Sequence, residues 1–338
     1  MIKLFNEDNL ELMKRLPDES IDVICIDPPY LYLKNQKLER PFDEQKFFSE
    51  CARLLTKKGF IVMFGRGESF YRWNTLLENI RLYKGEYVII DKKVTVVNDV
   101  DVEVFLTYNG VDISEDKEFK RVFTFKEEII WDKRYSTSPV LPISRCHESI
   151  SIFTKGSGSI NAIKVQYDEF RTEHDIDKVV ADVNRLKSVF NNEISFNHVL
   201  NFLNGNRTDL EKKRSSNFAT SCQTKALGSQ TVSPMKSIKE GMKNKSIISL
   251  RRDHYNTMHP TQKPVRLLER LLALVIPESK PREEILVADF FAGSMSCMEA
   301  VHNMGMKGIA CEIDHEYFEK GKERIEKLKP LHPELFKN

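Results

Sequence analysis

Four consecutive residues near the N-terminus, Asp27-Pro28-Pro29-Tyr30, join a carboxylate, a rigid turn and an aromatic ring. Two successive prolines fix φ and remove two N–H donors, so the turn offers its carbonyl groups as acceptors. An amino group on a planar ring has two N–H donors, of which Asp27 can accept one and the Pro28 carbonyl the other. These acceptors would draw positive charge from the nitrogen as it attacks a methyl group, while Tyr30 stacks on the ring. The motif predicts a site for a planar amino-bearing base; an ordinary Pro-Pro loop after a strand is the alternative.

A second candidate group lies near the C-terminus, in Asp289-Phe290-Phe291-Ala292-Gly293-Ser294. Small residues between a strand and a helix let the backbone approach a ligand closely, and the helix N-terminus favours a carboxylate. About twenty residues further on, Glu312 ends the next expected strand, where an acid can bind both ribose hydroxyls of a nucleoside cofactor. The sequence has no Gly-x-Gly-x-x-Gly fingerprint, which argues against a dehydrogenase. Each piece alone could be a tight turn or a surface acid, but together with Asp27 they indicate one shared site.

The elements that must position these residues alternate between strands and helices. Val23-Ile24-Cys25-Ile26, directly before Asp27, is apolar throughout, which is typical of a strand buried on both faces of a parallel sheet. Further strands are expected at 3–5, 60–64, 129–131, 150–153, 284–289 and 308–312, and helices at 9–16, 43–55, 70–82, 265–276, after the turn at 294 through 301, and 315–328. This alternation predicts an α/β fold. Because the expected neighbours of the last strands come first in the chain, a single sheet closes only if the two ends lie close together.

Two regions interrupt the alternation. Residues 86–125 are rich in β-forming residues around the turn signal Asn109-Gly110, which predicts an inserted β-hairpin; its acids favour a lid or a subunit contact over contact with nucleic acid. From about 156 to 256 the sequence is polar, with one helix expected near 176–190, which is typical of an inserted module ordered on binding. Residues 205–252 carry eleven basic and three acidic side chains. This excess of positive charge predicts binding to phosphates, and a solvated loop is the alternative interpretation.

Composition restricts the class of protein. The 338 residues, 41% of them hydrophobic and 30% charged, suffice for one large domain or for a core with an inserted module. The start lacks the apolar run of a signal peptide, and the longest apolar stretch, 267–276, is too short and too charged to cross a bilayer. Six scattered cysteines without a Cys-x-x-Cys pair argue against a zinc site and indicate unpaired thiols in a reducing cytoplasm.

The order of the motifs resembles a known family. An early Asp27-Pro28-Pro29-Tyr30, a long middle region, and then His259-Pro-Thr-Gln-Lys-Pro264 and Asp289-Phe-Phe-Ala-Gly-Ser294 are similar to the β-group amino methyltransferases of bacterial and phage DNA. The resemblance covers 1–84, 127–156 and 251–328, and includes Trp131-Asp-Lys133 and Arg145-Cys-His147-Glu148. It implies a Rossmann-like fold that binds S-adenosylmethionine and is circularly permuted, with an inserted target recognition region. Residues 1–156, with the hairpin at 86–125, would be the catalytic half, 157–250 the target recognition region, and 251–338 the cofactor-binding half.

Individual roles follow from the same resemblance. Asp27, Pro28, Pro29 and Tyr30 would hold a flipped-out base and its amino group, and Asp27 would also border the cofactor. The other residues implied to bind S-adenosylmethionine are Asp8 at its adenine, Glu312 at its ribose, Phe291, Ala292 and Gly293 at its methionine end with Asp289 in support, and Thr261 and Lys263 at its carboxylate. No metal is implied, and His259 receives no proton-transfer role.

The implied reaction is an in-line methyl transfer to N6 of an adenine that is rotated out of a specific sequence in double-stranded DNA. Adenine is preferred because family members with Asp at the first motif position usually modify adenine, whereas those with Ser usually modify N4 of cytosine. Cytosine N4 stays the alternative, and RNA is a weaker one. The resemblance places the protein in the cytoplasm of a bacterial or phage-infected cell. A homodimer is expected because dimers are common in the family, and a restriction endonuclease counterpart is the other partner that the family allows.

Met295 departs from the family, which usually has a glycine at this position. If the position needs a positive φ or a close approach to the cofactor, methionine there costs about 1–2 kcal/mol. An alternative from another class is therefore a catalytically degenerate DNA-binding scaffold, which need not bind the cofactor. The intact Asp27–Tyr30 motif, Lys263 and Glu312 favour the enzyme.

Overall fold

The computed structural model describes residues 1–30, 39–96, 102–135, 143–165, 242–252, 258–259 and 261–329. The chain forms two compact units, Met1–Asn161 together with Lys245–Asn338, and Ala162–Asn244. The described part of the second unit contains the paired strands β12 (Lys164–Val165) and β13 (Met242–Lys243). The helix expected near 176–190, and most of the segment expected to be the target recognition region, lie outside the described residues.

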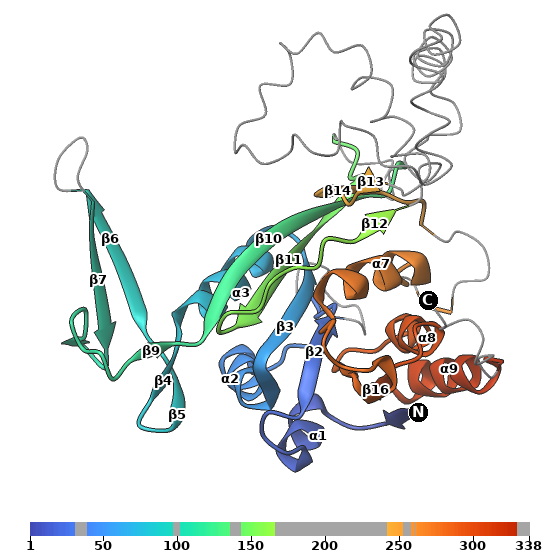
Figure 1. Ribbon diagram of the computed structural model, residues 1–338, viewed down its shortest axis with the longest axis horizontal. Helices are drawn as coiled ribbons and strands as arrows, with labels where there is room; N and C mark the ends of the chain where they lie inside the picture. The colour runs from blue at the N-terminus through green and yellow to red at the C-terminus, as the bar shows by residue number, and fades with distance from the viewer. Residues whose placement is uncertain are drawn as a thin grey trace, which may run out of the picture. The chain divides into compact units, whose positions relative to one another are not determined.

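The first unit is built on an eight-stranded sheet in the order β1-β16-β15-β2-β3-β11-β10-β14 (Figure 1). Its strands are β1 (Ile2–Phe5), β2 (Ile21–Ile26), β3 (Leu55–Gly65), β10 (Phe123–Asp132), β11 (His147–Lys155), β14 (Ile247–Ser249), β15 (Leu286–Asp289) and β16 (Lys307–Cys311). Neighbours from β1 to β3 are parallel, β11 is antiparallel to β3 and β10, and β14 is parallel to β10. The expected α/β fold with a mostly parallel Rossmann-like sheet is thereby confirmed.

The two ends of the chain meet in this sheet. Strand β1 pairs with β16 in the register Ile2↔Gly308 to Phe5↔Cys311, and β15 lies between β16 and β2. The last strands of the chain therefore need the first strands as neighbours, as the permuted order of the motifs predicts.

Helices cover the two faces of the sheet (Figure 1). One face carries α1 (Asn9–Arg15), α2 (Glu44–Leu54) and α3 (Gly67–Asn79), and the other carries α7 (Val265–Val275), α8 (Ser296–Asn303) and α9 (His315–Glu326), with a short 3-10 turn at Arg282–Glu284 before β15. Asp8, Asp43 and Asp314 cap α1, α2 and α9, because each carboxylate accepts hydrogen bonds from N–H groups of the first turn. In the described ranges, no helix has the length and apolarity needed to span a membrane.

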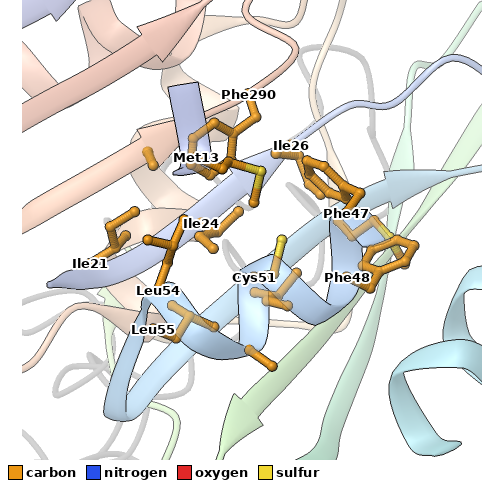
Figure 2. Close-up of a cluster of buried hydrophobic side chains, with 14 of the residues drawn as sticks. Met13, Ile21, Ile24, Ile26, Phe47, Phe48, Cys51, Leu54, Leu55 and Phe290 are labelled. Atoms are coloured by element: carbon orange, nitrogen blue, oxygen red, sulfur yellow. The ribbon is translucent and has the colours of Figure 1, made fainter. Parts of the chain in front are cut away.

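The core beneath α2 fixes the position of β2. Phe47, Phe48 and Cys51 of α2 are fully buried and lie against Ile24 and Ile26 of β2 (Figure 2). Because alternate side chains of a strand point to opposite faces, the residues between them face the other helical layer. All six residues of β2 are buried, which explains the apolar run Val23–Ile26 and makes the turn that follows a rigid platform.

The chain segment between α3 and β10 forms two small sheets. One consists of β4 (Ile80–Tyr83), β5 (Glu86–Ile89) and β9 (Lys120–Arg121), and the other of β6 (Asp91–Val96), β7 (Val102–Tyr108) and β8 (Val111–Asp112). The expected helix at 70–82 was wrong at both ends, because α3 begins at Gly67 and ends at Asn79. Its last residues instead form β4, since Lys84 and Gly85 adopt positive φ and turn the chain back into β5.

Candidate functional site

The candidate residues meet at the carboxyl edge of the parallel strands. Asp27 follows β2, Asp289 ends β15 and Glu312 follows β16, and the three strands are adjacent and parallel. Open α/β sheets bind their ligands at this edge. A pocket of about 220 Å³ is lined there by every predicted site residue: Asp8, Asp27, Pro28, Pro29, Tyr30, Thr261, Lys263, Asp289, Phe291, Ala292, Gly293 and Glu312.

The part of the pocket formed by the Asp27–Tyr30 turn is called the acceptor side after its expected role. It is organised around Asp27. Its Oδ1 accepts a hydrogen bond of 2.6 Å from the hydroxyl of Tyr30, and its Oδ2 accepts one from Nζ of Lys263. The carbonyl of Tyr30 accepts a hydrogen bond of 2.5 Å from Oγ of Ser69. Burial raises the pKa of Asp27, and the nearby ammonium of Lys263 opposes this shift. A carboxylate with both oxygens held keeps its remaining lone pairs in fixed directions and can receive an N–H donor from the pocket.

The part of the pocket formed by residues 289–293 and Glu312, called the cofactor side after its expected role, contains a tight loop held to the ends of β15 and β16 through backbone N–H groups. Phe291 N donates to Oδ1 of Asp289 at 3.1 Å, Ala292 N donates to the Cys311 carbonyl at 3.1 Å, and Gly293 N donates to Oε2 of Glu312 at 2.8 Å. Gly293 has a φ of 45°, and a Cβ at this residue would lie 3.4 Å from the ring of His259. The loop therefore depends on glycine for its left-handed conformation, whereas a Cβ would make only an ordinary van der Waals contact with His259.

Two carboxyl groups, one buried and one half-buried, support this loop. Burial raises the pKa of Asp289 to about 8, so this group is largely protonated at neutral pH. Burial also raises the pKa of Glu312, whose Oε1 accepts a hydrogen bond of 2.8 Å from the N–H of Asp314. Glu312 thus points its carboxylate along the pocket from the end of β16, where it could accept hydrogen bonds from vicinal hydroxyls.

Met295 is the N-cap of α8 and adopts the left-handed conformation, with φ 59° and ψ 21°. The position therefore has the positive φ for which glycine is favoured. The methionine side chain is completely buried. A Cβ at Gly321 of α9 would lie 2.4 Å from Cγ of Met295. The absence of a side chain at Gly321 therefore makes room for the methionine, and the strain at residue 295 is offset in part by the burial of its side chain.

His259 is a neutral packing residue. Its Nδ1 lies 3.0 Å from Oγ1 of Thr261, and its ring packs edge-on against Tyr317 with centroids 4.3 Å apart. Burial lowers the pKa of His259 to about 4, so the ring is uncharged at neutral pH and accepts the hydrogen bond from Thr261.

Lys263 has two carboxylate partners that the sequence did not predict, while its expected place at the carboxylate of the cofactor stays a prediction. Its ammonium contacts Asp27 and lies 3.2 Å from Oε2 of Glu148 and 5.0 Å from the ring centre of Phe64. Glu148 was missed as a site residue, because an acid near the start of β11 has no distinctive spacing; only its place in the Arg145-Cys-His147-Glu148 match pointed to it.

Asp8 and Phe42 also line the pocket. Oδ1 of Asp8 accepts a hydrogen bond of 2.9 Å from Leu10 N, so this exposed carboxylate caps α1 while lining the pocket. Phe42 also was not predicted; its ring contacts that of Phe291 edge-on at 5.0 Å and closes the apolar wall beside the loop.

The geometry defines a class of protein: a Rossmann-like α/β protein with a pocket at the carboxyl edge of its parallel strands, where folds of this class bind their ligands. The model of the DNA methylase family, which comprises N6 and N4 methyltransferases, matches residues 21–323, and the chain belongs to this family.

Individual relatives are more distant. The Type II methyltransferase M.BamHI of Bacillus amyloliquefaciens is 30% identical over 109 residues, which span 27% of this chain and 23% of that relative. The PvuII DNA methyltransferase (cytosine-N4-specific) is similar in fold, with a TM-score of 0.50 and 13% identity over 99% of this chain and 89% of that chain. The M1.HpyAVI–SAM complex has a TM-score of 0.47 and 16% identity over 96% of this chain and 100% of that chain.

Proposed function

We propose that this protein transfers a methyl group from S-adenosylmethionine to N6 of an adenine that is rotated out of a specific sequence in double-stranded DNA. One observation carries the proposal: the Asp27-Pro28-Pro29-Tyr30 turn borders the same pocket as Glu312 and the loop at 289–293. A methyl donor and an amino acceptor held in one pocket need only to be aligned for direct transfer.

The residues on the cofactor side fit S-adenosylmethionine. Glu312 offers a carboxylate to the two ribose hydroxyls, and Gly293 leaves the loop open to close approach because it lacks a Cβ. Asp8 lies at the outer end of the pocket, where the adenine of the cofactor would bind. When bound, the cofactor supplies an electrophilic methyl group on a sulfonium. The chain itself orients that group and excludes water from it.

On the acceptor side, Asp27 and the carbonyl of Pro28 receive the two N–H donors of the base. The carboxylate stabilises the positive charge that develops on the nitrogen, in a partly buried position where such an interaction is strong. Tyr30 provides an aromatic face that offsets part of the stacking lost when the base leaves the duplex. The rigid Pro-Pro turn fixes both acceptors before the base arrives.

N6 of adenine is the proposed target because Asp27 opens the acceptor motif, as it does in the adenine enzymes that the sequence resembles. N4 of cytosine is the second candidate, since the family includes both activities and a fold neighbour is named as cytosine-N4-specific. Both amino groups present the same two donors to Asp27 and Pro28, so the mechanism is the same for either base.

The proposed partners follow from this reaction. Double-stranded DNA is the substrate, and the segment 157–250, which includes most of the basic residues noted above, is proposed to recognise its sequence. A homodimer, a restriction endonuclease counterpart and a bacterial or phage-infected cytoplasm belong to the same proposal.

Incubation with mixed-sequence duplex DNA and labelled S-adenosylmethionine, followed by nucleoside mass spectrometry, tests the proposal. N6-methyladenine is the expected product. N4-methylcytosine would keep the mechanism and correct the base. DNA without any new methyl group, together with no binding of the cofactor, would favour the degenerate scaffold instead.

A further inference from the structure

A row of four alternating charges leads from the end of β10 to the acceptor motif Asp27–Tyr30. Nζ of Lys133 lies 3.1 Å from Oε1 of Glu148, Nζ of Lys263 lies 3.2 Å from Oε2 of Glu148, and the same ammonium contacts Oδ2 of Asp27. Each inner member therefore has an opposite charge on both sides. The row has no net charge, and Asp27 is the member that belongs to the Asp-Pro-Pro-Tyr turn.

The row is buried. The side chains of Lys133, Glu148, Lys263 and Asp27 are 4%, 15%, 7% and 22% exposed. Burial alone would raise the pKa of Glu148, but the two lysines hold it below its ordinary value. Buried ion pairs contribute little net stability, because desolvation opposes their attraction, and apolar residues of similar volume often stabilise a fold as well or better. Stability alone is therefore a poor reason for four charges at this place.

Rigid elements hold the outer half of the row. Glu148 is the second residue of β11 and pairs with Trp131 across the ladder to β10. Lys133 directly follows β10, and its N–H donates to the Cys146 carbonyl at 2.7 Å. The backbone of Glu148 is thus fixed by two strands. Lys263, by contrast, lies in the loop before α7. Its side chain is long and flexible, so its ammonium needs a fixed partner to stay in one place.

We propose that Glu148, held by Lys133, is a positioning residue that keeps the ammonium of Lys263 on Asp27 and so fixes the direction in which the Asp27 carboxylate meets the amino group of the base. The inference rests on the function proposed above. Tyr30 holds one oxygen of Asp27 and Lys263 holds the other, so loss of either lets the carboxylate rotate. Lys263 then serves the acceptor side of the pocket and not the carboxylate of the cofactor.

This assignment predicts a separation of rate from binding. Replacing Glu148→Gln keeps the size of the side chain and removes its charge, which releases Lys263 from β11. A small misplacement of a reacting group reduces the rate strongly, so the single-turnover rate should fall at least about tenfold at saturating DNA and cofactor. The dissociation constants for S-adenosylmethionine and for duplex DNA should change less than about threefold, because neither ligand is held by Glu148.

Two further variants guard against a purely structural explanation. Lys133→Met breaks the row at its outer end and should give a smaller loss of rate than Glu148→Gln, which answers the question even if the latter fails to fold. Asp22→Asn is the matched control, because Asp22 is also a buried carboxylate, is paired with Lys280 at 2.6 Å, and lies at the opposite end of β2, outside the pocket. It should lower the melting temperature and leave the rate unchanged.

The decisive experiment is a double-mutant cycle of single-turnover methyl transfer with Glu148→Gln and Lys263→Met. If Glu148 acts through Lys263, its replacement causes no further loss in the Lys263→Met background. Equal losses in both backgrounds, or a Glu148→Gln protein with the wild-type rate, would overturn the inference while leaving the proposed function intact. Losses that merely follow cofactor affinity or melting temperature would also overturn it. A wild-type protein that methylates no DNA would instead contradict the proposed function, and this inference with it.

Discussion

In the acceptor half of the pocket, the Asp27–Tyr30 turn with Lys263, side chains hold the key carboxylate. In the cofactor half, the loop at 289–293 with Glu312, backbone N–H groups hold the carboxyl groups. Asp27 receives its hydrogen bonds from Tyr30 and Lys263, which are two separate side chains. Glu312 receives its hydrogen bonds from the N–H groups of Gly293 and Asp314. The acceptor half can therefore be broken one side chain at a time, while the cofactor half is sensitive above all to backbone conformation.

The largest expected effect is in the acceptor half. Asp27→Ala removes the acceptor that stabilises the developing charge, and the transfer rate should fall by at least about 10²–10³-fold. Measured in parallel, binding of duplex DNA should be nearly unchanged, because the phosphates dominate affinity. A variant that retains substantial activity would remove Asp27 from the mechanism.

The next effect concerns the strained turn in the cofactor half. Gly321→Ala places a Cβ against the side chain of Met295 and should destabilise the protein by about 1–3 kcal/mol in denaturant unfolding. In a Met295→Gly background the same change should be close to neutral, since the obstructing side chain is gone. Additive losses in the two backgrounds would show that the two residues do not share this space.

A smaller effect on cofactor affinity is expected from Gly293→Ala. The left-handed φ of 45° disfavours alanine, and the added methyl group approaches the ring of His259. Strain of about 1 kcal/mol, when it acts on the bound conformation, weakens S-adenosylmethionine binding by roughly five- to tenfold in calorimetry. Gly85→Ala is the control, because Gly85 has a φ of 90° in a turn outside the pocket; it should leave affinity unchanged. Equal effects of the two substitutions would refute a specific role for the loop.

The smallest effect is on the pH dependence of stability. The pKa of His259 is lowered to about 4 by burial, so the folded state binds fewer protons than the unfolded state between about pH 4 and 6.5. The stability that this group contributes is therefore present above pH 6.5 and is lost as the pH falls toward 4, on the order of 1 kcal/mol by pH 5. His259→Asn should flatten this part of the melting-temperature profile. An unchanged slope would mean that another group causes it.

The central sheet could be predicted from the sequence because its strands have clear apolar runs that end at acidic residues. The four residues Val23–Ile26 of β2 form an uninterrupted apolar run, and Asp27, Asp289 and Glu312 mark the ends of three strands. Their meeting in one pocket followed from the rule that parallel strands end at the same edge. The end of α3 was harder to place, because the positive φ of Lys84 and the pairing of β4 with β5 override a helical pattern that continues to Leu82.

The partner of Lys263 could not be predicted from the sequence. Lys263 and Glu148 are far apart along the chain, and only the antiparallel placement of β11 beside β3 brings Glu148 to the carboxyl edge near Asp27. The sequence indicated that Met295 could need a positive φ, and the structure shows one. The space that Gly321 leaves for the methionine side chain, however, depends on how α9 packs against α8. Tertiary packing decides such contacts, and no local pattern encodes them.

The position of bound cofactor tests the central claim most directly. A crystal structure with S-adenosylhomocysteine should show the ribose hydroxyls on Glu312, the sulfur directed toward Asp27, and the ammonium of Lys263 still between Asp27 and Glu148. A ligand bound outside this pocket, or one whose carboxylate has drawn Lys263 away from Asp27, would contradict the division of the pocket into an acceptor half and a cofactor half.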